Sequence, residues 1–215
     1  MVYPFLIMTD PGSMGRAFIV GCGPSLAWTP MDKLISETTF AMNRINLLYP
    51  TTSWRPTYYF AMDWTNPNMA ADVLINIAEA RHSFVRSDRA HGLELQRNVF
   101  EWPARVTYFM PCLIHIGCNH LSAHRPAAWH LPNVCRYGST LNIAMQCAVL
   151  MGYWPLYLLG CDLGFRPVDP HENAINDPNH FHGGYGGHDD FPIEGRDETL
   201  RHMHLIAERS SPVRI

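Results

Sequence analysis

The chain has 215 residues, of which 47% are hydrophobic and 16% are charged, and its formal net charge is −3. A single domain of this length can bury about 70% of the surface of its unfolded form, so no disulfide framework is needed to hold it together. The weakly acidic balance gives no basic stripe, which argues against nucleic acid as the main partner.

Cysteine usage and the N-terminal residues bear on the compartment. The six cysteines contain no Cys-x-x-Cys pair, and Cys147 and Cys161 lie in apolar stretches where a free thiol behaves as a small hydrophobe. An N-terminal apolar patch is interrupted by Pro4, Asp10 and Pro11, with no basic region before it, so it predicts neither a signal peptide nor a membrane span. We therefore expect a reducing, cytoplasmic location, in solution or at the periphery of the inner membrane.

Four apolar runs predict buried strands, and each run ends on a small or polar residue suited to holding a ligand. The runs cover residues 17–21, 38–42, 57–62 and 156–161, and they lead into Gly21 to Ser25, Asn43, Asp63 and Asp162. If these strands are parallel, all four endings lie on one carboxyl edge of one sheet, where open α/β folds bind ligands.

The connections between these runs alternate with them. Thr29 and Pro30 are typical of a helix start, residues 67–80 have one apolar helical face, and residues 82–85 and 106–110 could add strands. This alternation predicts an α/β fold with a mostly parallel sheet flanked by helices, forming a single domain over residues 1–215.

The C-terminal half begins with a helix over residues 139–151, which is apolar on nearly every side and should lie buried against the sheet. Gly152 suits a left-handed C-terminal cap. Residues 164–195, called the lid segment here, are rich in Gly, Pro, Asp and His, a composition typical of a functional lid or a disordered loop. A final helix is expected near residues 197–209.

The glycine loop Gly21-Cys22-Gly23-Pro24-Ser25 directly follows the first strand. Glycines there let the backbone approach a phosphate, whose charge free N–H groups can meet. The alternative is a plain tight turn.

The other polar strand endings also have two interpretations. The amide of Asn43 can contact a base or a sugar, and the carboxylates of Asp63 and Asp162 can hold a ribose hydroxyl, a magnesium ion or a helix N-terminus. For each of these residues the alternative is a role as a cap or turn residue, because Asn and Asp are frequent at such positions. Ser139 and Thr140 could clamp a phosphate or carboxylate, or Ser139 could simply cap the helix that follows.

The lid segment contains His180, His182 and His188 among glycines. A histidine on a mobile lid can take a proton from a substrate while the lid excludes water. The same histidines could bind a metal with Asp189 and Asp190, or the loop could be solvated and disordered.

A second group of zinc-type side chains has a spacing that matches none of the common structural zinc patterns, so no metal is expected there. Its members are Cys112, His115, Cys118, His120 and His124.

Several short motifs together resemble a known family. Residues 19–26, Asn43, the Tyr-Gly-Ser-Thr at 137–140, the Met-Gly-Tyr at 151–153 and residues 156–162 are similar to bacterial sialyltransferases of the lipooligosaccharide-modifying type. They also resemble the related group that includes archaeal hydroxymethylpterin diphosphokinase. The resemblance spans about residues 17–205 and implies a Rossmann-like fold, a CMP-sialic acid donor, and no required metal or cofactor.

The resemblance also implies roles for individual residues. Gly21, Gly23, Pro24 and Ser25 would border the donor phosphate and sugar, Asn43 would contact the nucleotide or donor, and Ser139 and Thr140 would lie near the donor carboxylate. The family's general base is a lid histidine: a gapless reading favours His180 or His182, and the Gly-His dipeptide favours His188.

The chain departs from the family in three places. Cys22 stands where the sialyltransferases usually have asparagine, and Gly164 replaces a tyrosine that steadies the leaving phosphate. The end at Ile215 falls short of the family, as in a truncated reading frame.

The resulting hypothesis is a glycosyltransferase that moves a sugar, with sialic acid one candidate, from a CMP-activated donor to a hydroxyl of a glycan or lipid-linked acceptor. One alternative is a diphosphokinase in which Asp63 and Asp162 carry magnesium for ATP. The other is an inactive nucleotide-binding remnant. The sequence leaves the oligomeric state open.

Overall fold

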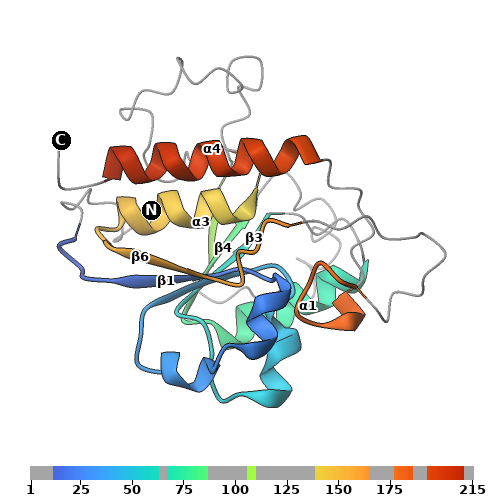
Figure 1. The fold of residues 1–215 in the computed structure, drawn as a ribbon. Helices are drawn as coiled ribbons and strands as arrows, with labels where there is room; N and C mark the ends of the chain where they lie inside the picture. Colours follow the sequence, from blue (N-terminus) through green and yellow to red (C-terminus); the bar gives the residue numbers. More distant parts are fainter. Residues whose placement is uncertain are drawn as a thin grey trace.

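The computed structural model describes residues 12–62, 67–86, 106–109, 139–164, 177–185 and 193–210. These residues form a six-stranded sheet with helices on both faces (Figure 1). The predicted α/β, Rossmann-like architecture is confirmed. That residues 1–215 form one domain stays a prediction.

All strand pairings in the sheet are parallel among the described residues. The strands are β1 Ala17–Val20, β2 Thr39–Met42, β3 Tyr58–Ala61, β4 His82–Arg86, β5 Val106–Phe109 and β6 Leu156–Leu159. Their spatial order is β5-β4-β3-β2-β1-β6. The chain therefore moves outward from β1 to β5 and returns to the other side of β1 for β6. Such a reversal creates the switch point at which open α/β sheets place their ligands.

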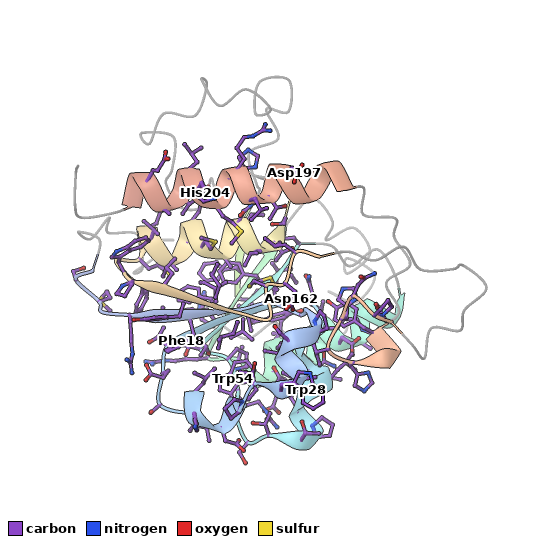
Figure 2. The ribbon with its side chains drawn as sticks, in the orientation of Figure 1. Phe18, Trp28, Trp54, Asp162, Asp197 and His204 are labelled. Carbon is purple, nitrogen blue, oxygen red and sulfur yellow. The ribbon has the colours of Figure 1, made fainter. Side chains whose placement is uncertain are left out.

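One face of the sheet carries short helices. These are the 3₁₀ helices η1 Pro24–Trp28, η2 Met31–Leu34 and η3 Ile45–Thr51, together with α1 Pro67–Glu79 (Figure 1). The fully buried Trp54 fills this side of the core (Figure 2).

The helix expected to start at Thr29 differs from the prediction. It is one 3₁₀ turn capped at Pro30, with no side-chain cap. The Thr29 hydroxyl donates to the Ser25 carbonyl instead, and Asp32 accepts hydrogen bonds from Thr52 and Ser53. Pro30 and Asp32 suit a short 3₁₀ turn as well as the start of an α-helix. Four residues are too few to form an apolar face, which would have distinguished a helix from a turn.

The opposite face carries α3 Thr140–Leu150 and, outside it, α4 Ile193–Ser210 (Figure 1). All residues of α3 are buried, which confirms the prediction from its apolar composition. Gly152 has φ +88° and ends the helix as predicted. The outer helix buries Ile206 and exposes His204 (Figure 2). Among the described residues, no helix is long and apolar enough to cross a membrane.

Candidate functional site

The glycine loop after β1 lies against the end of β6. The N–H of Gly21 donates to the Leu159 carbonyl and the N–H of Gly23 to the Gly160 carbonyl, both at 2.8 Å. A Cβ on Gly21 would come within 2.4 Å of the Gly160 oxygen, and one on Gly23 within 2.1 Å of an Asp162 carboxylate oxygen. The two glycines are therefore required by the close approach of two chain segments, and their contact with a phosphate stays a prediction.

Asp162 acts as a cap in this arrangement. One of its carboxylate oxygens accepts hydrogen bonds from the Ser25 backbone N–H at 3.1 Å and from the Ser25 hydroxyl at 2.9 Å. The Ser25 N–H and hydroxyl are groups expected from the sequence to bind the phosphate of a nucleotide-sugar. A phosphate that binds them has to displace the Asp162 carboxylate, because one oxygen of that carboxylate already accepts hydrogen bonds from both groups.

Cys22 is turned into the protein. Its side chain is 8% exposed, and its thiol donates to the Met42 carbonyl at 3.3 Å. Burial raises the pKa of Cys22 to about 12, against a smaller lowering by the neighbouring Tyr185 hydroxyl. The thiol is therefore neutral near pH 7 and is not an activated nucleophile.

Asn43 follows β2 with a left-handed φ of +53°, a conformation that Asn tolerates better than most residues. Its N–H donates to the Phe60 carbonyl, and its own carbonyl accepts from the Tyr59 hydroxyl at 2.8 Å and the Asn76 amide at 3.1 Å. Hydrogen bonds at both the N–H and the carbonyl thus hold the Asn43 backbone in place.

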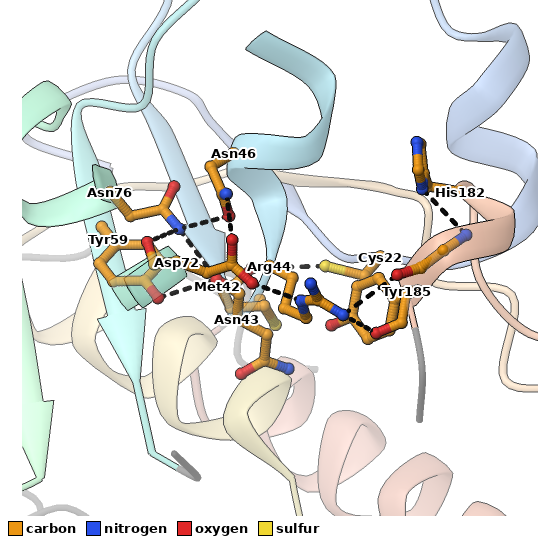
Figure 3. A network of polar contacts seen from close by, with 11 residues as sticks. Cys22, Met42, Asn43, Arg44, Asn46, Tyr59, Asp72, Asn76, His182 and Tyr185 are labelled. Atoms are coloured by element: carbon orange, nitrogen blue, oxygen red, sulfur yellow. Dashed lines mark hydrogen bonds and ion pairs between the residues drawn. The ribbon is translucent and has the colours of Figure 1, made fainter. Parts of the chain in front are cut away.

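The Asn43 side chain points away from that network (Figure 3). Its Oδ1 atom is buried and has no hydrogen-bond partner in the part of the chain that the structure describes. A buried acceptor without a donor is destabilising, and such exceptions call for an explanation. Among the predicted binding residues that the structure describes, Asn43 is one with such an atom, and its contact with a ligand stays a prediction.

Residues 177–185, the described part of the lid segment, contain a paired histidine. His180 Nδ1 lies 2.6 Å from Asp177 Oδ2, and the Asn179 N–H donates to the other Asp177 oxygen at 2.9 Å. The His180 ring stacks on Tyr185 with ring centroids 3.8 Å apart and planes at 4°.

These contacts set the protonation of His180. Burial lowers its pKa below the ordinary histidine value, and the Asp177 carboxylate opposes that shift without reversing it. The ring is therefore neutral near pH 7. A carboxylate at Nδ1 favours the tautomer with the proton on Nδ1, which leaves Nε2 as the proton acceptor.

The segment carrying His180 is held against the glycine loop. The Phe181 N–H donates to the Cys22 carbonyl at 3.0 Å. His182, in contrast, is exposed, and its Nδ1 accepts from the N–H of Gly184 at 3.1 Å within the same short turn. Among the described residues, His180 has a carboxylate to orient it and His182 does not.

Ser139 caps α3 as one interpretation predicted, because its hydroxyl accepts from the Asn142 N–H at 3.3 Å. Thr140 is buried in the first turn. Since α3 leads into β6 and runs antiparallel to it, its N-terminus lies toward the carboxyl edge, on the face opposite η1 (Figure 1). A role for Ser139 and Thr140 toward a donor carboxylate stays a prediction.

Other predicted residues lie outside the described part of the chain. They are Asp63, His188, Asp189, Asp190, and the zinc-type side chains at Cys112, His115, Cys118, His120 and His124. Within the described ranges, no group of three or more His, Cys, Asp or Glu side chains is placed to hold a metal ion.

Arg44 and its partner Asp72 were not predicted from the sequence. Arg44 Nε donates to Asp72 Oδ2 at 2.5 Å, and its Nη1 donates to the carbonyls of Gly184 and Tyr185 (Figure 3). Its guanidinium also lies 5.6 Å from the centre of the Tyr185 ring. The sequence pointed to Arg44 only through its position directly after Asn43, at the end of a predicted strand.

The missed Asp177 had a clearer signal. It stands three residues before His180, a spacing at which a turn brings two side chains together. The lid histidines were instead expected, in one interpretation, to bind a metal with the acids that follow them, Asp189 and Asp190.

No family model matches the sequence, and a search of curated proteins finds no relative. Two solved structures are similar in fold. One is a variant of the sialyltransferase CstII in complex with CMP, with a TM-score of 0.50, 12% identity, and coverage of 91% of this chain and 78% of that one. The other is CstII from Campylobacter jejuni in complex with the substrate analogue CMP-3FNeuAc, with a TM-score of 0.48, 12% identity, and coverage of 91% and 77%.

At this identity the likeness establishes the fold alone. Neither structure is a diphosphokinase, so that part of the resemblance gains no support. The described residues of this chain have a sialyltransferase-like α/β fold.

Proposed function

We propose that this chain is a glycosyltransferase-like enzyme that transfers a sugar from a CMP-activated donor to an acceptor hydroxyl, with His180 as general base. The observation that carries the proposal is the His180–Asp177 pair, held at the carboxyl edge by the hydrogen bond from Phe181 to Cys22. The fold likeness to a CMP-bound sialyltransferase supports the choice of donor class.

In the proposed reaction, His180 Nε2 accepts the proton of the acceptor hydroxyl. The acceptor oxygen then forms a bond to the anomeric carbon, while the bond from that carbon to the phosphate oxygen of the donor breaks and CMP leaves with the electron pair. Asp177 stabilises the imidazolium that forms. General base catalysis of this kind contributes about 10²–10⁴-fold to a rate.

Donor binding would use two of the described features. The unpartnered Oδ1 of Asn43 would accept a hydrogen bond from the nucleotide or the sugar. Ser25 would offer its N–H and hydroxyl to the phosphate once the Asp162 carboxylate turns aside. The amides of Gly21 and Gly23 are already paired with Leu159 and Gly160, so they contribute shape rather than hydrogen bonds.

The diphosphokinase alternative gains no support from the two similar structures, neither of which is a diphosphokinase. It needs Asp162 as a magnesium ligand. The non-enzymatic alternative predicts nucleotide binding without turnover.

The direct test is calorimetric titration of the purified protein with CMP and CMP-sialic acid, and with UDP-glucose and ATP as controls, in magnesium and in EDTA. We expect binding of the CMP compounds that does not depend on magnesium. No heat with any CMP compound at millimolar concentration would exclude the donor assignment, and magnesium-dependent binding of ATP would favour the diphosphokinase.

Turnover is tested separately by CMP release from CMP-sugars in the presence of glycan acceptors. His180→Gln should bind CMP as the wild type does and lose about 10²-fold or more in turnover. His182→Gln is the matched control, since His182 is exposed and lacks a carboxylate partner in the described contacts. His188→Gln completes the set. Normal turnover in His180→Gln would refute the assignment of the base.

A further inference from the structure

We propose that Arg44 and Asp72 are positioning residues that hold the 177–185 segment over the carboxyl edge and thereby orient His180, without contacting substrate. This inference deepens the proposed function and rests on it for its catalytic consequence. The contacts themselves are independent of any assumed reaction.

Arg44 joins two parts of the molecule that are far apart in sequence. On one side its Nε pairs with Asp72 of α1 at 2.5 Å. On the other side its Nη1 donates to the backbone carbonyls of Gly184 and Tyr185, about 140 residues further along the chain. The planar guanidinium suits this task, because its donors point in fixed directions toward several acceptors at once.

Asp72 is in turn held by hydrogen bonds from other side chains. Asn46 donates to its second carboxylate oxygen at 2.6 Å, and Asn76 donates to Asn46 at 3.0 Å and to the Asp72 carbonyl at 2.9 Å. Tyr49 donates to Asn76 at 2.7 Å. Figure 3 shows Asn76 of α1 and Asn46 of η3 leading to Asp72 and from there to Arg44. A carboxylate held by several donors keeps one orientation, so Arg44 has a rigid support.

The other end of the contact reaches the histidine. Tyr185 is buried, its ring centre lies 5.6 Å from the Arg44 guanidinium, and the His180 ring stacks on it. Holding the carbonyl of Tyr185 therefore fixes the ring against which His180 lies. The side chain of Arg44 is only 16% exposed, and its Nε and Nη1 donors are directed at protein acceptors, so it is suited to positioning rather than to binding substrate.

Arg55 provides a matched control. It makes the same kinds of contact: an ion pair with Glu79 of α1 at 2.9 Å, hydrogen bonds to the carbonyls of Thr52 and Trp54, and a Tyr49 ring 4.1 Å from its guanidinium. None of these partners belongs to the 177–185 segment. Arg55→Met removes a similar set of interactions and leaves the segment attached.

The experiment compares amide hydrogen exchange, measured by NMR on the full chain, in wild type, Arg44→Met, Arg44→Lys, Asp72→Asn and Arg55→Met. We expect Arg44→Met to lower the protection of the Phe181 and Tyr185 amides by about tenfold or more relative to strand amides, since local opening becomes easier when an anchor is lost. Arg44→Lys should restore part of the protection, and Arg55→Met should not change it. Asp72→Asn, which preserves shape, should act in the direction of Arg44→Met.

A second readout separates positioning from general destabilisation. Loss of the anchor should expose His180 and remove a nearby positive charge, and both effects raise its pKa. Within the described part of the chain, the charged groups that act on His180 are Asp177 and Arg44. The acid limb of kcat/KM should therefore move to higher pH in Arg44→Met, which a smaller folded fraction alone cannot produce. kcat should fall while the KM for donor stays within about twofold.

The outcomes are distinguishable. If the Phe181 and Tyr185 amides are equally protected in wild type, Arg44→Met and Asp72→Asn, the positioning role is overturned even where sugar transfer is measured. If these amides lose protection in Arg44→Met but not in Arg55→Met, and the wild type transfers no sugar, the anchoring stands and the proposed function fails.

Discussion

At the scale of single residues, the carboxylate beside the candidate base gives the sharpest prediction. Asp177 raises the pKa of His180 against the lowering by burial, through both a hydrogen bond and charge attraction. Asp177→Asn should therefore lower the His180 pKa further, measured by NMR titration of the His180 ring. Turnover should fall about 10²-fold or more, because the tautomer is no longer held and the imidazolium is not stabilised. An unchanged or raised pKa would contradict the pairing.

The depressed pKa of His180 also predicts how stability depends on pH. Below the ordinary histidine pKa the unfolded chain takes up the proton before the folded one, so the unfolded state binds more protons there. Stability conferred by the neutral ring is complete above that pH and is lost as pH falls toward the folded pKa. Denaturant titrations between about pH 5 and 8 should show a steeper loss for wild type than for His180→Gln. Parallel curves would show that His180 is not buried in the folded state.

Replacing Asp162 should change the affinity for CMP, and the direction of the change distinguishes a carboxylate that competes with phosphate from one that contacts the nucleotide. If phosphate binds at Ser25, the carboxylate competes for the same two donors. Asp162→Ala should then tighten binding of CMP, while losing a cap worth about 1 kcal/mol in unfolding free energy. Calorimetry on this variant, with chemical denaturation beside it, measures both. Weaker CMP binding would instead mean that Asp162 contacts the nucleotide.

At the scale of elements, the periodicity of apolar residues predicted the long helices, whose character depends on many neighbouring residues. The all-round apolar character of α3 predicted a buried helix, and the single apolar face at 67–80 predicted α1. The 3₁₀ helix η1 was not predicted, and at η2 a helix start was expected but not its shortness, because four or five residues carry no period. The β4 and β5 strands lie within one residue of the apolar runs that predicted them.

The junction of β1 and β6 gives the prediction at this scale. Gly21→Ala would place a Cβ 2.4 Å from the Gly160 carbonyl oxygen, so one backbone segment has to move. We expect a loss of about 1–3 kcal/mol in unfolding free energy, the usual cost of overpacking. Gly164→Ala is the control, since its nearest neighbour outside the adjoining residues is 3.7 Å away. Equal stability of the two variants, by urea denaturation, would contradict the close approach.

At the scale of the whole molecule, the sequence predicted that the strand endings share one edge of the sheet but not which contacts join the residues there. Parallel strands with polar endings required a common edge, and β1, β2 and β6 do end there. The contacts that build the candidate site join residues such as Ser25 and Asp162, or Arg44 and Gly184, which are more than a hundred positions apart. No local pattern encodes such pairs. Asp177 and His180 were the exception, being neighbours in one turn.

Ligand linkage tests the proposed site through the stability of the whole fold. A ligand that binds only the folded state at 100 times its dissociation constant adds about 2.7 kcal/mol to the unfolding free energy. For a chain of this size each kcal/mol raises Tm by about 2–4 °C, so saturating CMP should raise Tm by about 5–11 °C. Scanning calorimetry with CMP, and with AMP as the control base, measures this shift. Because Asn43 Oδ1 is the acceptor expected to gain a partner, Asn43→Ala should lose most of the shift. A CMP-dependent shift of equal size in wild type and Asn43→Ala would place the nucleotide away from the end of β2.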